Sequence, residues 1–132
     1  MAQSITPFLM FEGTAEAAMR FYASLFKDAR IDRLERYGPG EAGVEGTVKK
    51  AACTLCGRSF ICSDSSVKHD FTFTPSISLL VELDSESEID EVFRRLADGG
   101  KVFMPLDHYG FSKKFGWIGD RFGVSWQLNL AA

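Results

Sequence analysis

The chain has 132 residues, of which 45% are hydrophobic and 12 are phenylalanine, and its formal net charge is −3. This supply of apolar side chains can fill the core of one compact domain, which argues against intrinsic disorder. Lysine and arginine are not gathered into a patch, so nucleic acid is not an expected partner. No apolar run could cross a bilayer, and MAQSITPFLMF lacks the regions of a secretory signal, so we expect a cytoplasmic protein without a membrane partner.

The first half of the chain predicts a strand, a helix and a second strand. Residues 5–11, ITPFLMF, form a short apolar strand, and a helix follows with Thr14 as its N-cap and Glu16 in its first turn. Its apolar residues recur at helical spacing, at Ala15, Ala18, Met19, Tyr22 and Phe26. Residues 29–37 can form the next strand.

A glycine-rich loop and a hairpin come next. GPGEAG at 38–43 lacks the lysine and the following helix of a phosphate-binding loop, so we expect no nucleotide there. Strands at about 46–55 and 58–64 are expected to pair around a tight turn at Cys56. Cys53 and Cys56 form a C-x-x-C without a partner pair, and they would point to opposite faces of the hairpin. We therefore interpret the cysteines as small buried residues of a hairpin, and not as a zinc or redox site.

The second half repeats this plan after a polar linker. A strand in PSISLLVEL precedes a capping box formed by Ser85 and Glu88. A helical stripe of Ile89, Val92, Phe93 and Leu96 then ends at Gly99-Gly100. Three further strands are predicted in KVFMPL, KFGWIGD and FGVSWQLNL. Each half would have a sheet with one helix-covered face, and would need the other half to close its core.

Two polar segments of the second half are candidates for ligand binding. From Phe122 to Leu130 apolar and polar residues alternate, so Ser125, Gln127 and Asn129 share one face of a strand, which can meet water or line a cavity. His108, Tyr109 and the pair Lys113-Lys114 lie in a loop before the seventh strand. This loop could cover a pocket, or it could be solvated surface.

Several segments resemble a known family in order and spacing. They are ITPFLMFEGTAEAAMRFYASLF, GPGEAGVEGTVKKAACTL, FICSD and FGWIGDRFGVSWQLNL, and together they extend over nearly the whole chain. They resemble the vicinal oxygen chelate (VOC) superfamily, which includes glyoxalase and bleomycin-resistance proteins. The closer similarity is to its PhnB-like branch, often labelled 3-demethylubiquinone-9 3-methyltransferase.

The resemblance implies an α+β, glyoxalase-like fold. Two paired βαβββ modules, at about 5–64 and 76–130 with a linker at 65–75, would form a curled mixed sheet around a shared cavity in a single VOC domain. It also implies a homodimer. By strand parity the cavity face would carry Ile5, Pro7, Leu9, Phe11, Lys50, Ala52, Ser78, Leu80, Ser125 and Gln127.

The resemblance also implies where metal ligands would lie in the metalloenzyme members. The four positions correspond here to Pro7, Lys50, Ser78 and Gln127. Proline has no side-chain donor atom, a protonated lysine repels a cation, and serine is a poor ligand, whereas a divalent ion of this class prefers imidazole and carboxylate. We therefore expect no metal and no cofactor.

The expected function is the binding of a small organic molecule in a metal-free cavity. The residues expected to bind it are Pro7, Lys50, Ser78, His108, Tyr109 and Gln127. The protein could be an enzyme that works without metal, through Lys50 or the 108–114 loop, or a sequestering protein like the bleomycin-resistance relatives. A metal-dependent glyoxalase or dioxygenase activity is the alternative if the ligand alignment is wrong. No methyl-donor motif supports the methyltransferase label, and catalytic residues are not assigned.

Overall fold

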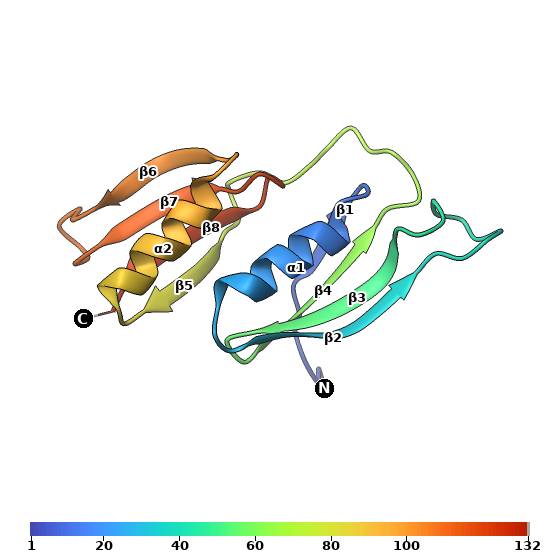
Figure 1. The fold of residues 1–132 in the computed structure, drawn as a ribbon, viewed down its shortest axis with the longest axis horizontal. Helices are drawn as coiled ribbons and strands as arrows, with labels where there is room; N and C mark the ends of the chain where they lie inside the picture. Colours follow the sequence, from blue (N-terminus) through green and yellow to red (C-terminus); the bar gives the residue numbers. More distant parts are fainter. Residues whose placement is uncertain (132) are drawn as a thin grey trace. The chain divides into compact units, whose positions relative to one another are not determined.

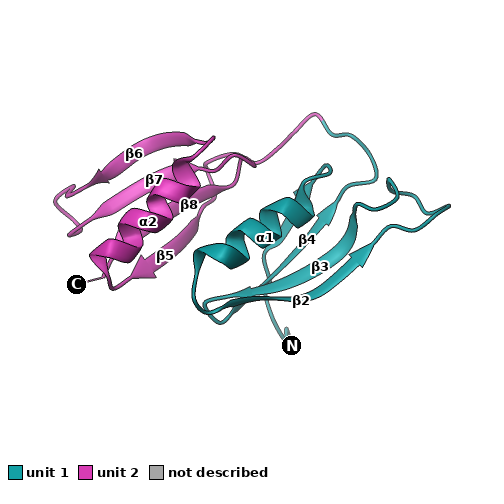
Figure 2. Ribbon diagram, in the orientation of Figure 1, with its two compact units in different colours: residues 1–69 teal, residues 70–132 magenta. Residues whose placement is uncertain are grey.

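The computed structural model describes residues 1–131 and divides the chain into two compact units (Figure 2). Unit 1 comprises residues 1–69, and unit 2 begins at residue 70. Each unit contains one helix and one four-stranded mixed sheet (Figure 1). Among the described residues no helix is long and apolar enough to span a membrane.

Unit 1 follows a βαβββ plan. Its elements are β1 (Phe8–Phe11), α1 (Ala15–Leu25), β2 (Ala29–Arg36), β3 (Val48–Leu55) and β4 (Arg58–Asp64). The strand order is β1-β4-β3-β2, in which β1 and β4 are parallel and the other neighbours are antiparallel.

Unit 2 repeats the same plan. Its elements are β5 (Leu79–Leu83), α2 (Glu86–Ala97), β6 (Lys101–Asp107), β7 (Phe115–Gly119) and β8 (Ser125–Leu130). The order β5-β8-β7-β6, with β5 and β8 parallel, is equivalent to that of unit 1. The predicted α+β class and the repeated module are therefore confirmed.

Each helix covers one face of its own sheet (Figure 1). The buried residues of both helices are mostly apolar. In α2 the buried side chains are Ile89, Val92 and Leu96, three of the four residues in the predicted stripe. In α1 they are Ala15, Ala18, Met19, Tyr22 and Leu25. Because a fully buried aliphatic side chain contributes roughly 1.5–3 kcal/mol, these stripes fix each helix on its sheet.

The two helix starts are capped in different ways. The Ser85 hydroxyl accepts a hydrogen bond from the backbone N–H of Glu88 at 3.3 Å, as the capping box predicted. Thr14 is the N-cap residue of α1, as predicted, but its side chain makes no cap hydrogen bond. The carboxylate of Asp64, at the end of β4, accepts from the N–H groups of Gly13 and Ala15 instead, at 2.7 and 3.0 Å.

The β3–β4 hairpin turns at two residues with positive φ, Cys56 (51°) and Gly57 (79°). Such a pair suits the right-handed twist of a two-residue hairpin. Cys53 is buried, as expected, but the expectation of burial was wrong for Cys56, which is exposed because it lies in the turn itself. Burial raises the pKa of the Cys53 thiol to about 11 and that of Cys62 to about 12.

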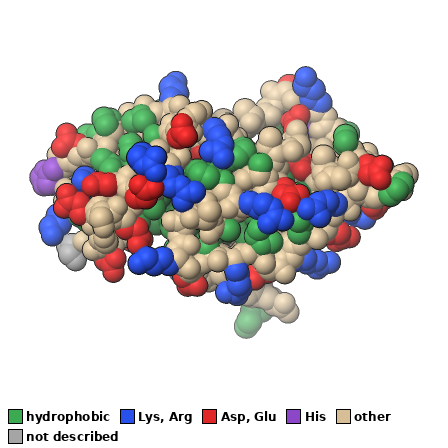
Figure 3. Space-filling model, viewed as in Figure 1, with side chains coloured by type: hydrophobic (Ala, Val, Ile, Leu, Met, Phe, Trp, Pro, Cys, Tyr) green, Lys and Arg blue, Asp and Glu red, His purple; other side chains and the backbone are tan. Residues whose placement is uncertain are grey.

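Charged side chains are interspersed on the surface of both units. On the face drawn in Figure 3 blue basic groups alternate with red acidic groups and form no continuous basic area. Many are paired, as in Arg36 with Glu16 at 2.8 Å and Arg94 with Glu91 at 2.6 Å.

Candidate functional site

The sheet of unit 2 has a second face, which α2 does not cover, and we call it the helix-free face. Trp126 and Leu128 of β8 are buried on the α2 side, where Gly116, the neighbour of Leu128 in β7, lies against Phe93 of the helix. Side chains alternate along a strand, so Gln127 lies on the helix-free face. Its neighbours in register are Leu80 of β5 and Trp117 of β7.

Asp120 sets where β8 begins. Its carboxylate is buried and accepts from the N–H groups of Phe122 and Val124, at 2.8 and 3.1 Å, and from the indole N–H of Trp126 at 2.9 Å. These bonds hold the turn between β7 and β8. The strand predicted from Phe122 therefore starts three residues later, at Ser125.

A chain of polar side chains crosses the helix-free face. The indole N–H of Trp117 donates to the Ser125 hydroxyl at 2.8 Å, and the hydroxyls of Ser125 and Ser78 lie 2.7 Å apart. The side-chain amide of Gln127 donates to the Ser78 oxygen at 3.3 Å. Two of the predicted ligand-binding residues, Ser78 and Gln127, are thus in direct contact although they lie 49 positions apart in the sequence.

Apolar side chains surround this polar chain. Phe103 of β6 lies against Trp117, with ring centroids 4.9 Å apart. Leu80 of β5 keeps 59% of its surface exposed. The face therefore combines aromatic and aliphatic surface with a few convergent polar groups, which is the composition of small-molecule sites.

One carboxylate also belongs to this face. Glu82 of β5 is in register with Asn129 and accepts from its side-chain amide at 2.8 Å. The sequence reasoning did not select Glu82. The signal was present, because Ser78, Leu80 and Glu82 follow one another at the spacing of two that places strand residues on one face.

The structure places Pro7 and Lys50 in unit 1, on non-adjacent elements. Pro7 is exposed, immediately before β1, and its carbonyl accepts from the N–H of Ile61 in β4 at 3.0 Å. Lys50 is exposed on β3 and pairs in register with Glu35 of β2. Strand β4 separates β1 from β3 in the sheet.

The predicted cavity face of unit 1 is wrong for Leu9 and Phe11. In register Leu9 is beside Cys62, whose sulfur lies 4.0 Å from that of Met19 in α1, so Leu9 shares the helix-covered face. Phe11 is in register with Asp64, whose carboxylate bonds to the start of α1, so Phe11 also lies on the helix-covered face. Only 4% of the surface of Phe11 is exposed. In β3 the neighbour of Cys62 is Ala51, which therefore also lies on the helix-covered face. Side chains alternate along a strand, so Lys50 lies on the face that α1 does not cover.

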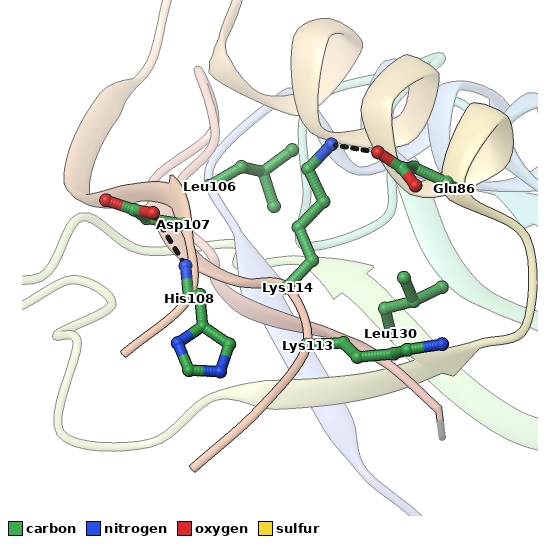
Figure 4. Close-up of a pocket in the computed structure, with 7 residues that line it drawn as sticks. All are labelled: Glu86, Leu106, Asp107, His108, Lys113, Lys114 and Leu130. Atoms are coloured by element: carbon green, nitrogen blue, oxygen red, sulfur yellow. Dashed lines mark hydrogen bonds and ion pairs between the residues drawn. The ribbon is translucent and has the colours of Figure 1, made fainter. Parts of the chain in front are cut away.

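The 108–114 loop lines a pocket of about 330 Å³ within unit 2 (Figure 4). The lining residues are Glu86, Leu106, Asp107, His108, Lys113, Lys114 and Leu130. Lys114 points toward the start of α2, where its ammonium lies 2.6 Å from Asp90 and 3.3 Å from Glu86. These ion pairs join the loop to the helix, and the hydrogen bond to Asp90 raises the pKa of Lys114.

Tyr109 lies in an aromatic group and is not among the lining residues of this pocket. Its ring is stacked 6.1 Å from that of Phe111 and meets Phe115 edge-on at 6.2 Å. Its hydroxyl donates to the carbonyl of Pro105 at 2.5 Å. Tyr109 therefore holds the loop, whereas His108 borders the pocket.

The residues at the implied metal positions do not suit a divalent ion. Ser78 and Gln127 are engaged with each other, and Pro7 and Lys50 contribute no donor atom to a cation. Within residues 1–131 no group of three or more His, Cys, Asp or Glu side chains is arranged to hold a metal ion. The chemistry of this donor set offers one neutral amide oxygen where such ions prefer imidazole and carboxylate.

Comparison with known proteins gives one family match. Residues 3–129 match the family described as 3-demethylubiquinone-9 3-methyltransferase. No curated protein matches the chain.

Solved structures of similar proteins extend this match. A PhnB protein from Bacillus cereus is 56% identical over 98% of this chain and 100% of its own, with a TM-score of 0.96. Protein PA1353 from Pseudomonas aeruginosa is 27% identical over 98% of both chains, with a TM-score of 0.85. The fosfomycin resistance protein FosX from Mesorhizobium loti is 10% identical over 100% of this chain and 95% of its own, and its TM-score of 0.65 shows a shared fold alone.

Proposed function

Because the chain belongs to the family described as 3-demethylubiquinone-9 3-methyltransferase, the PhnB-like branch of the VOC superfamily, we propose that it binds a small organic molecule without a metal ion. The proposed binding surface is the helix-free face of unit 2. One observation carries this proposal, namely the chain of hydrogen bonds from Trp117 through Ser125 and Ser78 to Gln127. These polar groups converge within a surface formed by Leu80, Phe103 and Trp117, as they do in ligand pockets.

The proposal includes no metal ion because the side chains at the four implied ligand positions offer too few suitable donor atoms. The metalloenzyme mechanism of the superfamily needs a cation that polarises substrate oxygens and a carboxylate that moves a proton. Gln127 stands at the position of that carboxylate, and an amide cannot accept a proton at neutral pH. A metal-dependent activity would require ligands outside the four implied positions.

Binding alone and catalysis remain two forms of this function. A sequestering protein needs only the surface, whereas an enzyme also needs a group that moves protons or attacks the substrate. Lys50 and His108 are the predicted residues that offer such groups, and Glu82 lies on the helix-free face itself. Methyl transfer is not part of the proposal, because the sheets formed by residues 1–131 are mixed and include no doubly wound parallel sheet with a glycine-rich turn before its helix.

A thermal-shift screen with aromatic and quinone-like compounds tests the proposal. Compounds that raise the melting temperature of the wild type should do so less in Gln127→Ala and Trp117→Ala. Glu91→Ala, on the exposed side of α2, is the matched control and should respond as the wild type does. Identical responses in all four proteins would reject the helix-free face as the site.

The same compounds separate the two forms of the function. Incubation of each hit with protein, followed by mass spectrometry of the compound, shows whether it is converted. Conversion that depends on protein concentration would identify an enzyme. Tight binding with unchanged compound would identify a sequestering protein.

A homodimer is the assembly proposed for the chain, on the basis of the family alone. Light scattering at working concentration should give twice the mass of 14.7 kDa. A mass of one chain would contradict this part of the proposal without affecting the ligand site.

A further inference from the structure

An aromatic group from the loop between β6 and β7 lies at one end of the helix-free face. Phe115 of β7 is in register with Asn129 of β8, so it lies on this face, yet it is only 8% exposed. Its cover comes from the loop, because the ring of Phe111 meets that of Phe115 edge-on at 5.1 Å and the ring of Tyr109 does so at 6.2 Å. The loop therefore folds over this end of the face.

The loop is held on both sides of its tip. On one side the Tyr109 hydroxyl donates to the carbonyl of Pro105 at 2.5 Å. On the other side the Ser112 hydroxyl bonds to the side-chain oxygen of Asn129 and accepts from the N–H of Lys114 at 3.2 Å. Gly110 and Phe111 lie between these two fixed points.

The tip itself is not held by hydrogen bonds. In the part of the chain that the structure describes, neither Gly110 nor Phe111 forms one. Gly110 has a φ of 87°, and a Cβ atom added there would meet nothing within 4 Å, so the backbone can turn at this residue without a clash. The side chain of Phe111 is 66% exposed. The tip can therefore move while the rest of the loop stays in place.

Trp117, which belongs to the proposed ligand surface, is the next residue of β7 on the same face. One residue separates it from Phe115, which places their Cα atoms roughly 6.5 Å apart. The indole N–H of Trp117 donates to Ser125, which is in register with Gly119, so the indole leans away from Phe115. A ligand ring between Trp117 and Phe115 would lie within reach of Phe111.

From this arrangement we propose that Phe111 is a movable aromatic lid of the ligand site. The inference rests on the function proposed above. When a ring binds beside Trp117, the tip turns at Gly110, and Phe111 leaves the edge of Phe115 and packs against the ligand. Binding thereby covers an aromatic side chain that is exposed in the free protein.

Two charged groups also lie on this face, and neither takes part in the ring contacts of Phe111. The ammonium of Lys101 lies 5.7 Å from the centre of the Phe103 ring, and the carboxylate of Glu82 is bound by Asn129. The lid therefore acts on the apolar part of a ligand, whatever charge the ligand carries.

The neutral naphthalene dye Prodan tests the inference on the full chain, because its fluorescence gives both the dissociation constant and the dissociation rate. Phe111→Ala should weaken binding roughly 2- to 10-fold, the effect of one aromatic contact, mainly through faster dissociation. Phe111→Tyr keeps the ring and should bind as the wild type does. Val44→Ala is the matched control, because it removes an exposed apolar side chain from a loop of unit 1. Circular dichroism melts check that each variant keeps its fold.

Nuclear magnetic resonance with labelled phenylalanine tests the movement itself. In the free protein a nuclear Overhauser cross-peak should join the rings of Phe111 and Phe115, whose centres are 5.1 Å apart. Saturation with Prodan should weaken this cross-peak and produce one between Phe111 and the dye.

The possible failures are distinguishable. If Phe111→Ala bound Prodan as tightly as the wild type while Trp117→Ala weakened binding, the inference would be overturned and the proposed function would stand. A Phe111–Phe115 cross-peak that stays unchanged at saturation would also overturn the inference alone. If Prodan did not bind, or if Trp117→Ala changed nothing, both the inference and the proposed site would fall.

Discussion

Replacement of Asp64 by alanine is expected to destabilise the protein strongly. The Asp64 side chain is 2% exposed, and its two oxygens accept from three backbone N–H groups. Gly13 and Ala15 donate to one oxygen at 2.7 and 3.0 Å, and Val48 donates to the other at 2.9 Å. One carboxylate thus joins the end of β4, the first turn of α1 and the start of β3.

The magnitude follows from the groups that would lose their acceptor. A hydrogen bond to a charged group contributes about 1.5–3 kcal/mol, and a buried N–H left without an acceptor costs about as much. The bonds from Ala15 and Val48 are buried, whereas water can reach Gly13 after the substitution. Two buried donors give an expected loss of about 3–6 kcal/mol, a large part of the roughly 5–15 kcal/mol that stabilises a typical domain.

Urea unfolding followed by circular dichroism measures this loss. Asp64→Asn should fall between the wild type and Asp64→Ala, because an amide retains one acceptor oxygen and loses the charge. Asp70→Ala is the matched control, since Asp70 is exposed, and its unfolding free energy should stay within about 0.5 kcal/mol of the wild type. A loss below about 1 kcal/mol in Asp64→Ala would refute the view that this carboxylate joins the three elements.

Three further outcomes are expected. At pH 8 iodoacetamide should modify Cys56 and leave Cys53 and Cys62 unmodified in the native protein, as peptide mass spectrometry would show; Cys56→Ser should remove the reaction. Burial raises the pKa of Cys53 from 9.0 to about 11 and that of Cys62 from 9.0 to about 12, so the stability that these neutral thiols contribute is complete below pH 9 and is lost as the pH rises toward 12. The midpoint of urea unfolding should therefore fall between pH 9 and 12, and it should fall less in Cys62→Ala. Ser85→Ala should cost about 1 kcal/mol, measured in the same unfolding assay, through loss of the cap on α2, and an unchanged midpoint would contradict the role of that hydroxyl.

The elements that the sequence predicted well are those set by local periodicity. The stripe of Ile89, Val92 and Leu96 follows from helical spacing, and these side chains are buried as expected. The cap by Ser85 could also be predicted from the sequence, because the donor and the acceptor of its hydrogen bond lie only three residues apart. The hairpin turn at Cys56-Gly57 was predicted for the same reason.

The features that the sequence did not predict depend on contacts between distant residues. The residues around Thr14 do not show that the side chain of Asp64, some 50 positions later, accepts the hydrogen bonds at the start of α1. The face of Leu9 was wrong because a four-residue strand has too few residues to fix its parity, which here follows from its register with β4. Glu82 was missed because its position becomes informative only when β5 is paired with β8.

Gln127 shows how the resemblance and the structure combine. The resemblance marks its position as that of a metal-binding carboxylate, and the alternation of β8 gives its face, but neither predicts its bond to Ser78, which follows from the parallel pairing of β5 with β8. Gln127→Glu would return the carboxylate and still leave Pro7, Lys50 and Ser78 without imidazole or carboxylate donors. The single substitution therefore cannot create a divalent-metal site, because such an ion requires three or more good ligands. Glutamine here bonds to Ser78 and contributes a neutral hydrogen-bonding group at the position where the resemblance places a carboxylate.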